Sequence, residues 1–376
     1  MEEFTDLILN SGDVILVVDG MLSFDFKQAY INTVLSLKKF QLLKFIPVKP
    51  RYLVLRVTEN CNSRCITCNA WKNHSKDELS FDEIRDILRQ CRDFGIDSVR
   101  LSGGEPLLRE DIADIVQVCS HLGFKEIYVG TNGLLLKEKA RELIESGVTR
   151  IGLSIDGVGE VNDLIRGVPG TYKRVIEGIK TVNAIKREKG LKLDVVNFTT
   201  ILTYNIDQIP NIIRMCQKLG VKWGFNLLDA NIHLFQGIDV QKLRVKDEAK
   251  IDKLMDYLLV LRRRLPGLIY ACEHVIEFGR EYLKNPDSAK RIPCVLGYAV
   301  LLVRSHGEIF PGCPILGPVG NFRKNKLTDV LKSEKYKRYA MRMYIRDCPG
   351  CSFFCGDNAM ISNIWAHKLK CEIMGF

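Results

Sequence analysis

The sequence has 376 residues, of which 46% are hydrophobic and 27% charged, and this composition is typical of a globular protein with a sizeable core. No apolar run approaches the roughly 18–20 residues that a membrane-spanning helix needs. The net charge of +10 is spread along the chain without an RNA-binding motif, so we expect a lysine-rich surface and no nucleic-acid partner. Because Met1-Glu2-Glu3 lacks the basic start of a signal peptide, we expect a cytoplasmic protein.

Residues 1–50 are predicted to form an N-terminal arm. Apolar residues alternate with lysines between Tyr30 and Phe45, which predicts a basic amphipathic helix that ends before Pro47 and Pro50. Two roles remain open for this helix. It caps one end of the fold, or it makes peripheral contact with a membrane surface.

From residue 51 onward, strands and helices alternate. Ser80 and Glu83 form a capping box before a helix that reaches about Phe94. The pattern predicts further helices at about 110–122, 137–146, 172–189 and 207–219, and strands at 51–58, 98–102, 126–130, 150–155, 192–201 and 222–228. Six such units imply an α/β fold with a parallel sheet, either an open barrel or a doubly wound sheet.

The last quarter of the chain has a different pattern. Helices at about 247–265 and 270–283 lead into a cysteine-rich tail with short strands at 298–303 and 308–310. The predicted domains are therefore the arm at 1–50, an α/β domain at 51–285 and a small α+β domain at 286–376.

The 13 cysteines are grouped rather than scattered. An odd count without a secretion signal argues against a disulfide framework. Four isolated cysteines are expected in the core, namely Cys91, Cys119, Cys216 and Cys272. The other nine form two groups, which are Cys61, Cys65 and Cys68 and then, in the tail, Cys294, Cys313, Cys348, Cys351, Cys355 and Cys371.

The first group lies directly after the first predicted strand with the spacing C-x3-C-x2-C. Three thiolates on one loop can bind three irons of a 4Fe–4S cluster and leave the fourth iron open. A structural zinc site would instead require a fourth protein ligand. This position, at the carboxyl end of a strand, is where βα barrels carry their catalytic loops.

This motif resembles the signature of the radical S-adenosylmethionine (SAM) superfamily, and the resemblance covers roughly residues 51–230. It implies a partial (βα)6 barrel that holds a 4Fe–4S cluster with SAM on its open iron. It also implies oxidoreductase-type chemistry, in which one electron cleaves SAM to a 5′-deoxyadenosyl radical that abstracts hydrogen from a substrate. No catalytic side chain is predicted from the sequence.

Other positions fit the same family. The run Gly103-Gly104-Glu105-Pro106 matches its GGEP motif, and Glu105 is expected to accept a hydrogen bond from the methionyl ammonium of SAM. Asn132 and Ser154 end the third and fourth strands, and Arg166 resembles an arginine that pairs with the methionyl carboxylate. Ordinary turns and a surface cation are the alternatives for these three. Thr67 stands where the family often has an aromatic residue beside the adenine, which puts that contact in doubt.

The six tail cysteines resemble those of SPASM and twitch domains, which hold auxiliary iron–sulfur clusters. The resemblance implies one or two auxiliary 4Fe–4S clusters, and a zinc knuckle is the alternative.

Three functions follow as hypotheses. The first is a radical SAM enzyme that acts on a peptide or protein side chain, with an electron donor such as a ferredoxin or flavodoxin as partner. The second is the same chemistry on a small sugar- or lipid-linked substrate. The third is a non-catalytic iron–sulfur electron carrier.

Overall fold

The computed structural model describes residues 49–73, 76–229, 237–291, 294 and 296–351. The predicted N-terminal helix, Cys355 and Cys371 lie outside these residues.

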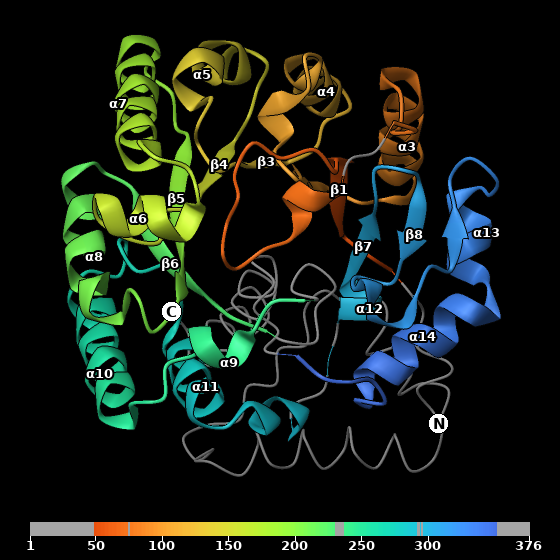
Figure 1. Cartoon of the computed structure of the whole chain (residues 1–376). Coiled ribbons are helices and arrows are strands. Elements are labelled where there is room, and N and C mark those ends of the chain that lie inside the picture. The colour runs from red at the N-terminus through yellow and green to blue at the C-terminus, as the bar shows by residue number, and fades with distance from the viewer. Residues whose placement is uncertain (1–48, 74–75, 230–236, 292–293, 295, 352–376) are drawn as a thin grey trace, which may run out of the picture. The chain divides into compact units, whose positions relative to one another are not determined.

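Six parallel strands form the centre of the described structure (Figure 1). They are β1 (Tyr52–Thr58), β2 (Ser98–Gly103), β3 (Glu126–Gly130), β4 (Arg150–Leu153), β5 (Asp194–Ile201) and β6 (Lys222–Leu227). The sheet order is β6-β5-β4-β3-β2-β1-β7-β8-β9, so each of the six strands pairs with its neighbour in sequence. The sheet is that of a partial barrel, and the predicted α/β fold is confirmed.

Helices connect these strands and cover the outside of the sheet in Figure 1. They are α3 (Phe81–Phe94), α4 (Ile112–His121), α5 (Leu136–Glu145), α7 (Thr171–Lys189) and α8 (Ile209–Lys218). The predicted capping box is present at the start of α3, where Ser80 and Glu83 exchange hydrogen bonds. Between β4 and α7 lies a short helix that the sequence analysis did not predict, α6 (Glu160–Arg166), which is flanked by two glycines with positive φ, Gly159 and Gly167.

The chain then forms α9 (Val240–Leu243), α10 (Glu248–Arg264) and α11 (Glu273–Lys284), followed by the tail. The tail contains α12 (Leu296–Ala299), β7 (Val300–Val303), β8 (Glu308–Phe310), β9 (Gly320–Asn321), α13 (Leu327–Lys332) and α14 (Glu334–Tyr344). Strand β7 is parallel to β1, while β8 and β9 are antiparallel to their neighbours. The tail strands thus extend the same sheet, and the domain boundary near residue 285 stays a prediction.

Strand β1 is buried on both faces, as strands in parallel sheets commonly are. On β1, Leu53, Leu55 and Val57 belong to the core under the helices, whereas Tyr52 and Val54 belong to a second cluster inside the barrel. Alternation along each strand therefore separates a helix-facing side from an interior side.

Large interior side chains lean over glycines of the next strand. A Cβ added at Gly152 would lie 1.9 Å from the Tyr128 hydroxyl oxygen, and one at Gly224 would lie 2.9 Å from a Phe198 ring carbon. Without these glycines the aromatic rings would not fit inside the barrel.

None of the helices among the described residues is both long and apolar enough to cross a membrane.

Candidate functional site

The loop after β1 carries the three cysteines of the first group. Cys65 is buried, while Cys61 and Cys68 are half-buried. Burial raises the pKa of the Cys65 thiol to about 12, and the nearby Cys68 and Cys61 add to this shift. Burial also raises the pKa of Cys61. The three thiols are therefore close enough to influence one another, and each must lose a proton before it can bind iron.

Backbone hydrogen bonds fix this loop to the end of α6. The N–H groups of Arg64 and Ile66 donate to the carbonyl oxygens of Arg166 and Ile165, each at 3.0 Å. These carbonyls belong to the last turn of α6 and have no partner within the helix. Cys65 lies between Arg64 and Ile66 in the sequence, so these two hydrogen bonds fix the position of its backbone relative to α6.

The cysteine sulfurs face N–H donors. The Ala70 N–H donates to Cys68 Sγ at 3.4 Å, and the Asn132 side-chain amide lies 4.0 Å from Cys61 Sγ. Such donors stabilise thiolates and cluster sulfur. Among the described residues, no three His, Cys, Asp or Glu side chains converge as ligands of one metal ion. Thiolates of a 4Fe–4S cluster bind separate irons, and this donor set fits that arrangement.

The glycines of the GGEP turn lie against the chain that leads to Cys61. A Cβ at Gly103 would lie 2.2 Å from the Thr58 carbonyl oxygen, and one at Gly104 would lie 2.1 Å from the Asn60 carbonyl oxygen. The N–H groups of Gly104 and Glu105 donate to these same oxygens at 2.8 and 2.7 Å. Only glycine permits so close an approach, and the turn at the end of β2 thereby holds the cysteine loop.

The Glu105 carboxylate is buried and accepts three hydrogen bonds from the protein. Its donors are the Leu107 N–H at 3.0 Å, the Thr131 hydroxyl at 2.7 Å and the Asn132 N–H at 2.6 Å. Burial raises its pKa, while these donors oppose the shift. A carboxylate accepts about four hydrogen bonds, so Glu105 joins the ends of β2 and β3 and keeps one site for another donor. Pro106 begins the short 3-10 helix η3 (Pro106–Leu108) that follows.

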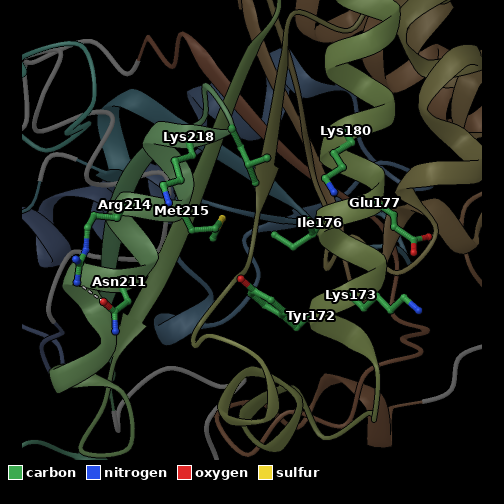
Figure 2. A pocket seen from close by; sticks show the side chains of 10 residues that line it. Tyr172, Lys173, Ile176, Glu177, Lys180, Asn211, Arg214, Met215 and Lys218 are labelled. Carbon is green, nitrogen blue, oxygen red and sulfur yellow. Dashed lines mark hydrogen bonds between the residues drawn. The ribbon is translucent and has the colours of Figure 1, made fainter.

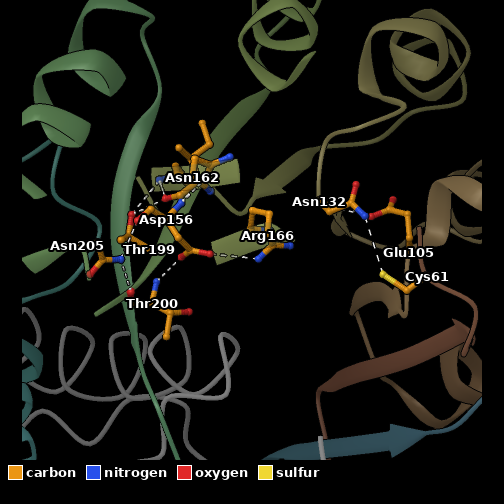
Figure 3. Close-up of polar contacts among 11 residues, drawn as sticks. Cys61, Glu105, Asn132, Asp156, Asn162, Arg166, Thr199, Thr200 and Asn205 are labelled. Atoms are coloured by element: carbon orange, nitrogen blue, oxygen red, sulfur yellow. Dashed lines mark hydrogen bonds and ion pairs between the residues drawn. The ribbon is translucent and has the colours of Figure 1, made fainter. Parts of the chain in front are cut away.

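Asn132 joins the end of β3 to the cysteine loop (Figure 3). Its side-chain amide donates to the Asn62 side-chain oxygen at 2.7 Å and approaches Cys61. Its own side-chain oxygen accepts from the Leu134 N–H at 2.9 Å. Both the amide nitrogen and the amide oxygen of Asn132 therefore have hydrogen-bond partners within the protein.

Arg166 pairs with a residue that the sequence analysis did not single out, Asp156 (Figure 3). The Arg166 Nη1 lies 3.1 Å from the Asp156 carboxylate, which also accepts from the Thr200 N–H at 2.7 Å. Burial opposes the charge of Arg166, but Cys65 and Asp156 raise its pKa above the ordinary value. The Arg166 Nε is buried and has no hydrogen-bond partner in the described part of the chain. That donor is available to a ligand beside the cysteines.

Ser154 is half-buried just after β4, and the next residue, Ile155, is held from β5. The Asn197 side chain accepts from the Ile155 N–H at 2.6 Å and donates to its carbonyl oxygen at 3.1 Å. The Thr199 hydroxyl donates to the same carbonyl at 2.8 Å. The two polar residues Asn197 and Thr199 within the apolar pattern of β5 are the sequence feature that could have predicted these hydrogen bonds to Ile155.

A comparison with protein-family models finds a match over the part of the chain that holds the cysteine loop. The model of the radical SAM superfamily matches residues 55–216, which contain the cysteine loop, the GGEP turn and α6.

Residues 55–216 match a radical SAM domain.

Curated relatives match slightly less than half of the chain. The Fe-coproporphyrin III synthase of Methanosarcina barkeri is 31% identical over 180 residues, covering 47% of this chain and 43% of that protein. The pre-heme d1 synthase of Dinoroseobacter shibae is 31% identical, covering 45% and 41%. The GTP 3′,8-cyclase of Peptoclostridium acidaminophilum is 34% identical, covering 44% and 51%. The chain thus spans about half the length of the curated relatives it matches.

Solved structures confirm the fold over a longer stretch. Streptococcus suis SuiB bound to precursor peptide SuiA has a TM-score of 0.62 at 21% identity, covering 89% of this chain and 76% of that one. Native anSMEcpe with bound AdoMet and Cp18Cys peptide has a TM-score of 0.59 at 16% identity, covering 78% and 83%. At these identities the likeness shows a shared fold.

Four tail cysteines come together beside the radical SAM barrel. Cys294, Cys313 and Cys351 are buried, and Cys348 is half-buried. Burial raises the pKa of Cys313, and Cys351, Cys294 and Cys348 add to the shift. Four thiols separated by up to 57 residues in sequence therefore lie within electrostatic range of Cys313 or are Cys313 itself, and their role as ligands stays a prediction.

The two cysteine groups lie at opposite ends of the sheet. Cys61 follows the carboxyl end of β1. Cys294 precedes β7, which is parallel to β1, and Cys313 follows the antiparallel β8. Both tail cysteines are therefore at the amino ends of the barrel strands.

A groove of about 760 Å³ lies on the outside of the barrel, between α7 and α8 (Figure 2). Its floor is apolar, and lysines and an arginine line its rim, including Lys180, Arg214 and Lys218. No predicted site residue lines it.

Proposed function

We propose that this chain is a radical SAM enzyme. The observation that carries the proposal is a loop of three cysteines fixed on two sides, by the GGEP turn and by the end of α6. Cys61, Cys65 and Cys68 would each bind one iron of a 4Fe–4S cluster and leave the fourth iron to SAM. The cluster, when bound, supplies the electron that cleaves SAM to methionine and a 5′-deoxyadenosyl radical, which abstracts hydrogen from the substrate.

The surrounding residues would bind and orient SAM. Gly103 and Gly104 hold the turn against the chain that leads to Cys61 and would contact the methionyl group through backbone atoms. Glu105 has one free acceptor site for the methionyl ammonium. The Arg166 Nε is the donor for the methionyl carboxylate. Asn132 and Ser154, together with Pro106, complete the wall of this pocket in the proposal.

We further propose an auxiliary 4Fe–4S cluster in the tail, within a domain at 286–376. Cys294, Cys313, Cys348 and Cys351 can supply four thiolates, which is the full ligand set of one such cluster. Cys355 and Cys371 would be ligands of the same or a second cluster.

The substrate in this proposal is a peptide or protein side chain. SuiB and anSMEcpe share the fold and were solved with peptides bound, which supports this class. A sugar- or lipid-linked small molecule is the alternative. A low-potential donor such as a ferredoxin or flavodoxin would supply electrons, and a cytoplasmic location would keep the thiols reduced.

Electron paramagnetic resonance tests the SAM site directly. The reconstituted, dithionite-reduced protein is expected to show a 4Fe–4S signal that changes when SAM is added. A signal that is identical with and without SAM would refute binding at the open iron. The Cys216→Ala variant, which changes a buried core cysteine, is the matched control and should respond as the wild type does.

A further inference from the structure

Arg304 lies inside the barrel, at the end of β7 nearest the cysteine loop. On β7, Val300 and Leu302 belong to the interior cluster, whereas Leu301 and Val303 pack under the helices. Alternation therefore places Arg304 on the interior side. Its guanidinium lies 5.4 Å from the ring centre of Phe310, another interior residue.

The neighbouring carboxylate, Glu59, is already paired with a different arginine. Arg56 faces the interior from β1 and donates to both Glu59 oxygens, at 3.0 and 2.6 Å. The Ser305 hydroxyl donates to the same carboxylate at 3.4 Å. Arg304 lies within electrostatic range of Glu59 but makes no ion pair within the described ranges.

Neither carboxylate in this sector of the barrel mouth pairs with Arg304 within the described ranges, because Glu59 pairs with Arg56 and Glu78 accepts from the Thr58 hydroxyl and the Glu59 N–H. Arg304 and Arg56 stand at the same level on adjacent strands, because Val303 pairs with Leu55 in the register. Arg304 is only half-buried, so solvent reaches it, and Glu59 is two residues before Cys61. A stacked, unpaired guanidinium in a partly desolvated position is suited to bidentate binding of a carboxylate or phosphate.

We propose that Arg304 binds an anionic group, carboxylate or phosphate, on the substrate and so selects an anionic substrate. This inference rests on the proposed function, which places the substrate in the barrel mouth beside the cysteine loop. Arg304 would bind and orient the substrate. The hydrogen atom would be abstracted by the 5′-deoxyadenosyl radical, as proposed above.

Equilibrium dialysis of the reconstituted full-length protein with SAM present tests the proposal. The two probes are 32P-labelled inorganic pyrophosphate and 14C-labelled succinate, which separate a phosphate site from a carboxylate site. At least one probe should bind. Arg304→Met should weaken its binding by about tenfold or more, and Arg304→Lys by less, because lysine keeps the charge but loses the two-pronged geometry.

Arg263→Met is the matched control, since Arg263 is exposed on α10 and pairs with Glu273 at 3.0 Å. Its anion binding should equal that of the wild type. Binding of neither probe to the wild type, or equal binding to Arg304→Met, would overturn the assignment. Cleavage of SAM by the wild type is measured separately, so a failure of the proposed function is distinguished from a failure of the anion site.

Discussion

At Gly167, the residue that ends α6, the backbone lies directly against the cysteine loop. Its φ is 68°, and an added Cβ would lie 2.1 Å from the Arg64 carbonyl oxygen. Arg64 adjoins Cys65, so a side chain at 167 would displace the backbone next to this proposed iron ligand. The backbone is fixed on both sides and cannot move away without breaking the two hydrogen bonds to α6.

Gly167→Ala is therefore expected to lower both the melting temperature and the iron bound after reconstitution. Gly190→Ala is the matched control, because Gly190 has nearly the same φ, 62°, with nothing within 4 Å of an added Cβ. Both substitutions place an alanine in the left-handed backbone conformation, which costs roughly 1–2 kcal/mol. Only Gly167→Ala also brings a Cβ into collision with the Arg64 carbonyl oxygen. Equal iron content and equal melting temperatures in the two variants would contradict the role of this contact.

Among the elements, α3 is joined to the tail through Arg323. This side chain pairs with Glu83 at 2.7 Å and with Asp77 at 2.8 Å. The hydrogen bond from Arg323 holds the pKa of Glu83 at about 2, below its usual 4.5. A carboxylate whose pKa is lowered by folding stabilises the folded state above its unfolded pKa, and this contribution is lost as the pH falls.

The Arg323→Ala variant should therefore melt at a lower temperature than the wild type near neutral pH. This difference should shrink as the pH falls below about 4.5, because the Glu83 carboxylate is then increasingly protonated in the unfolded chain. The effect is expected to be small, since Glu83 and Arg323 are both partly exposed to solvent, which screens their ion pair. Thermal unfolding of both proteins across this pH range measures it, and the exposed Arg338→Ala is the control. A difference that stays constant or grows toward low pH would contradict the assignment.

The strands and longer helices could be predicted from sequence because their signals are local. Apolar periodicity and the Ser80 capping box lie within single elements, and the spacing of Cys61, Cys65 and Cys68 lies within one loop. The pairing of Asp156 with Arg166 and the support of Ile155 by Asn197 are contacts across the fold, with no periodic pattern to reveal them. Helix α6 was missed because its seven residues are too few for a clear apolar stripe.

At the scale of the whole molecule, the described chain carries two cysteine groups at opposite ends of one sheet. The joint replacement of Cys61, Cys65 and Cys68 by Ala should remove the radical cluster and leave the tail intact. Roughly four irons per chain should remain for each auxiliary cluster, and Mössbauer spectra should show cubane iron. Stoichiometric zinc without iron in this variant would show instead that the tail is a structural zinc module.

The central claim is that the cysteine loop directs the reductive cleavage of SAM. Its most direct measurement is the quantity of 5′-deoxyadenosine and methionine formed when the reconstituted protein is incubated anaerobically with dithionite and SAM. The wild type should form the two products in equal amounts, and the variant with Cys61, Cys65 and Cys68 all replaced by Ala should form neither. An electron carrier would form no product in either protein. Undiminished 5′-deoxyadenosine from the variant, or none from a wild type with a full complement of iron, would contradict the account.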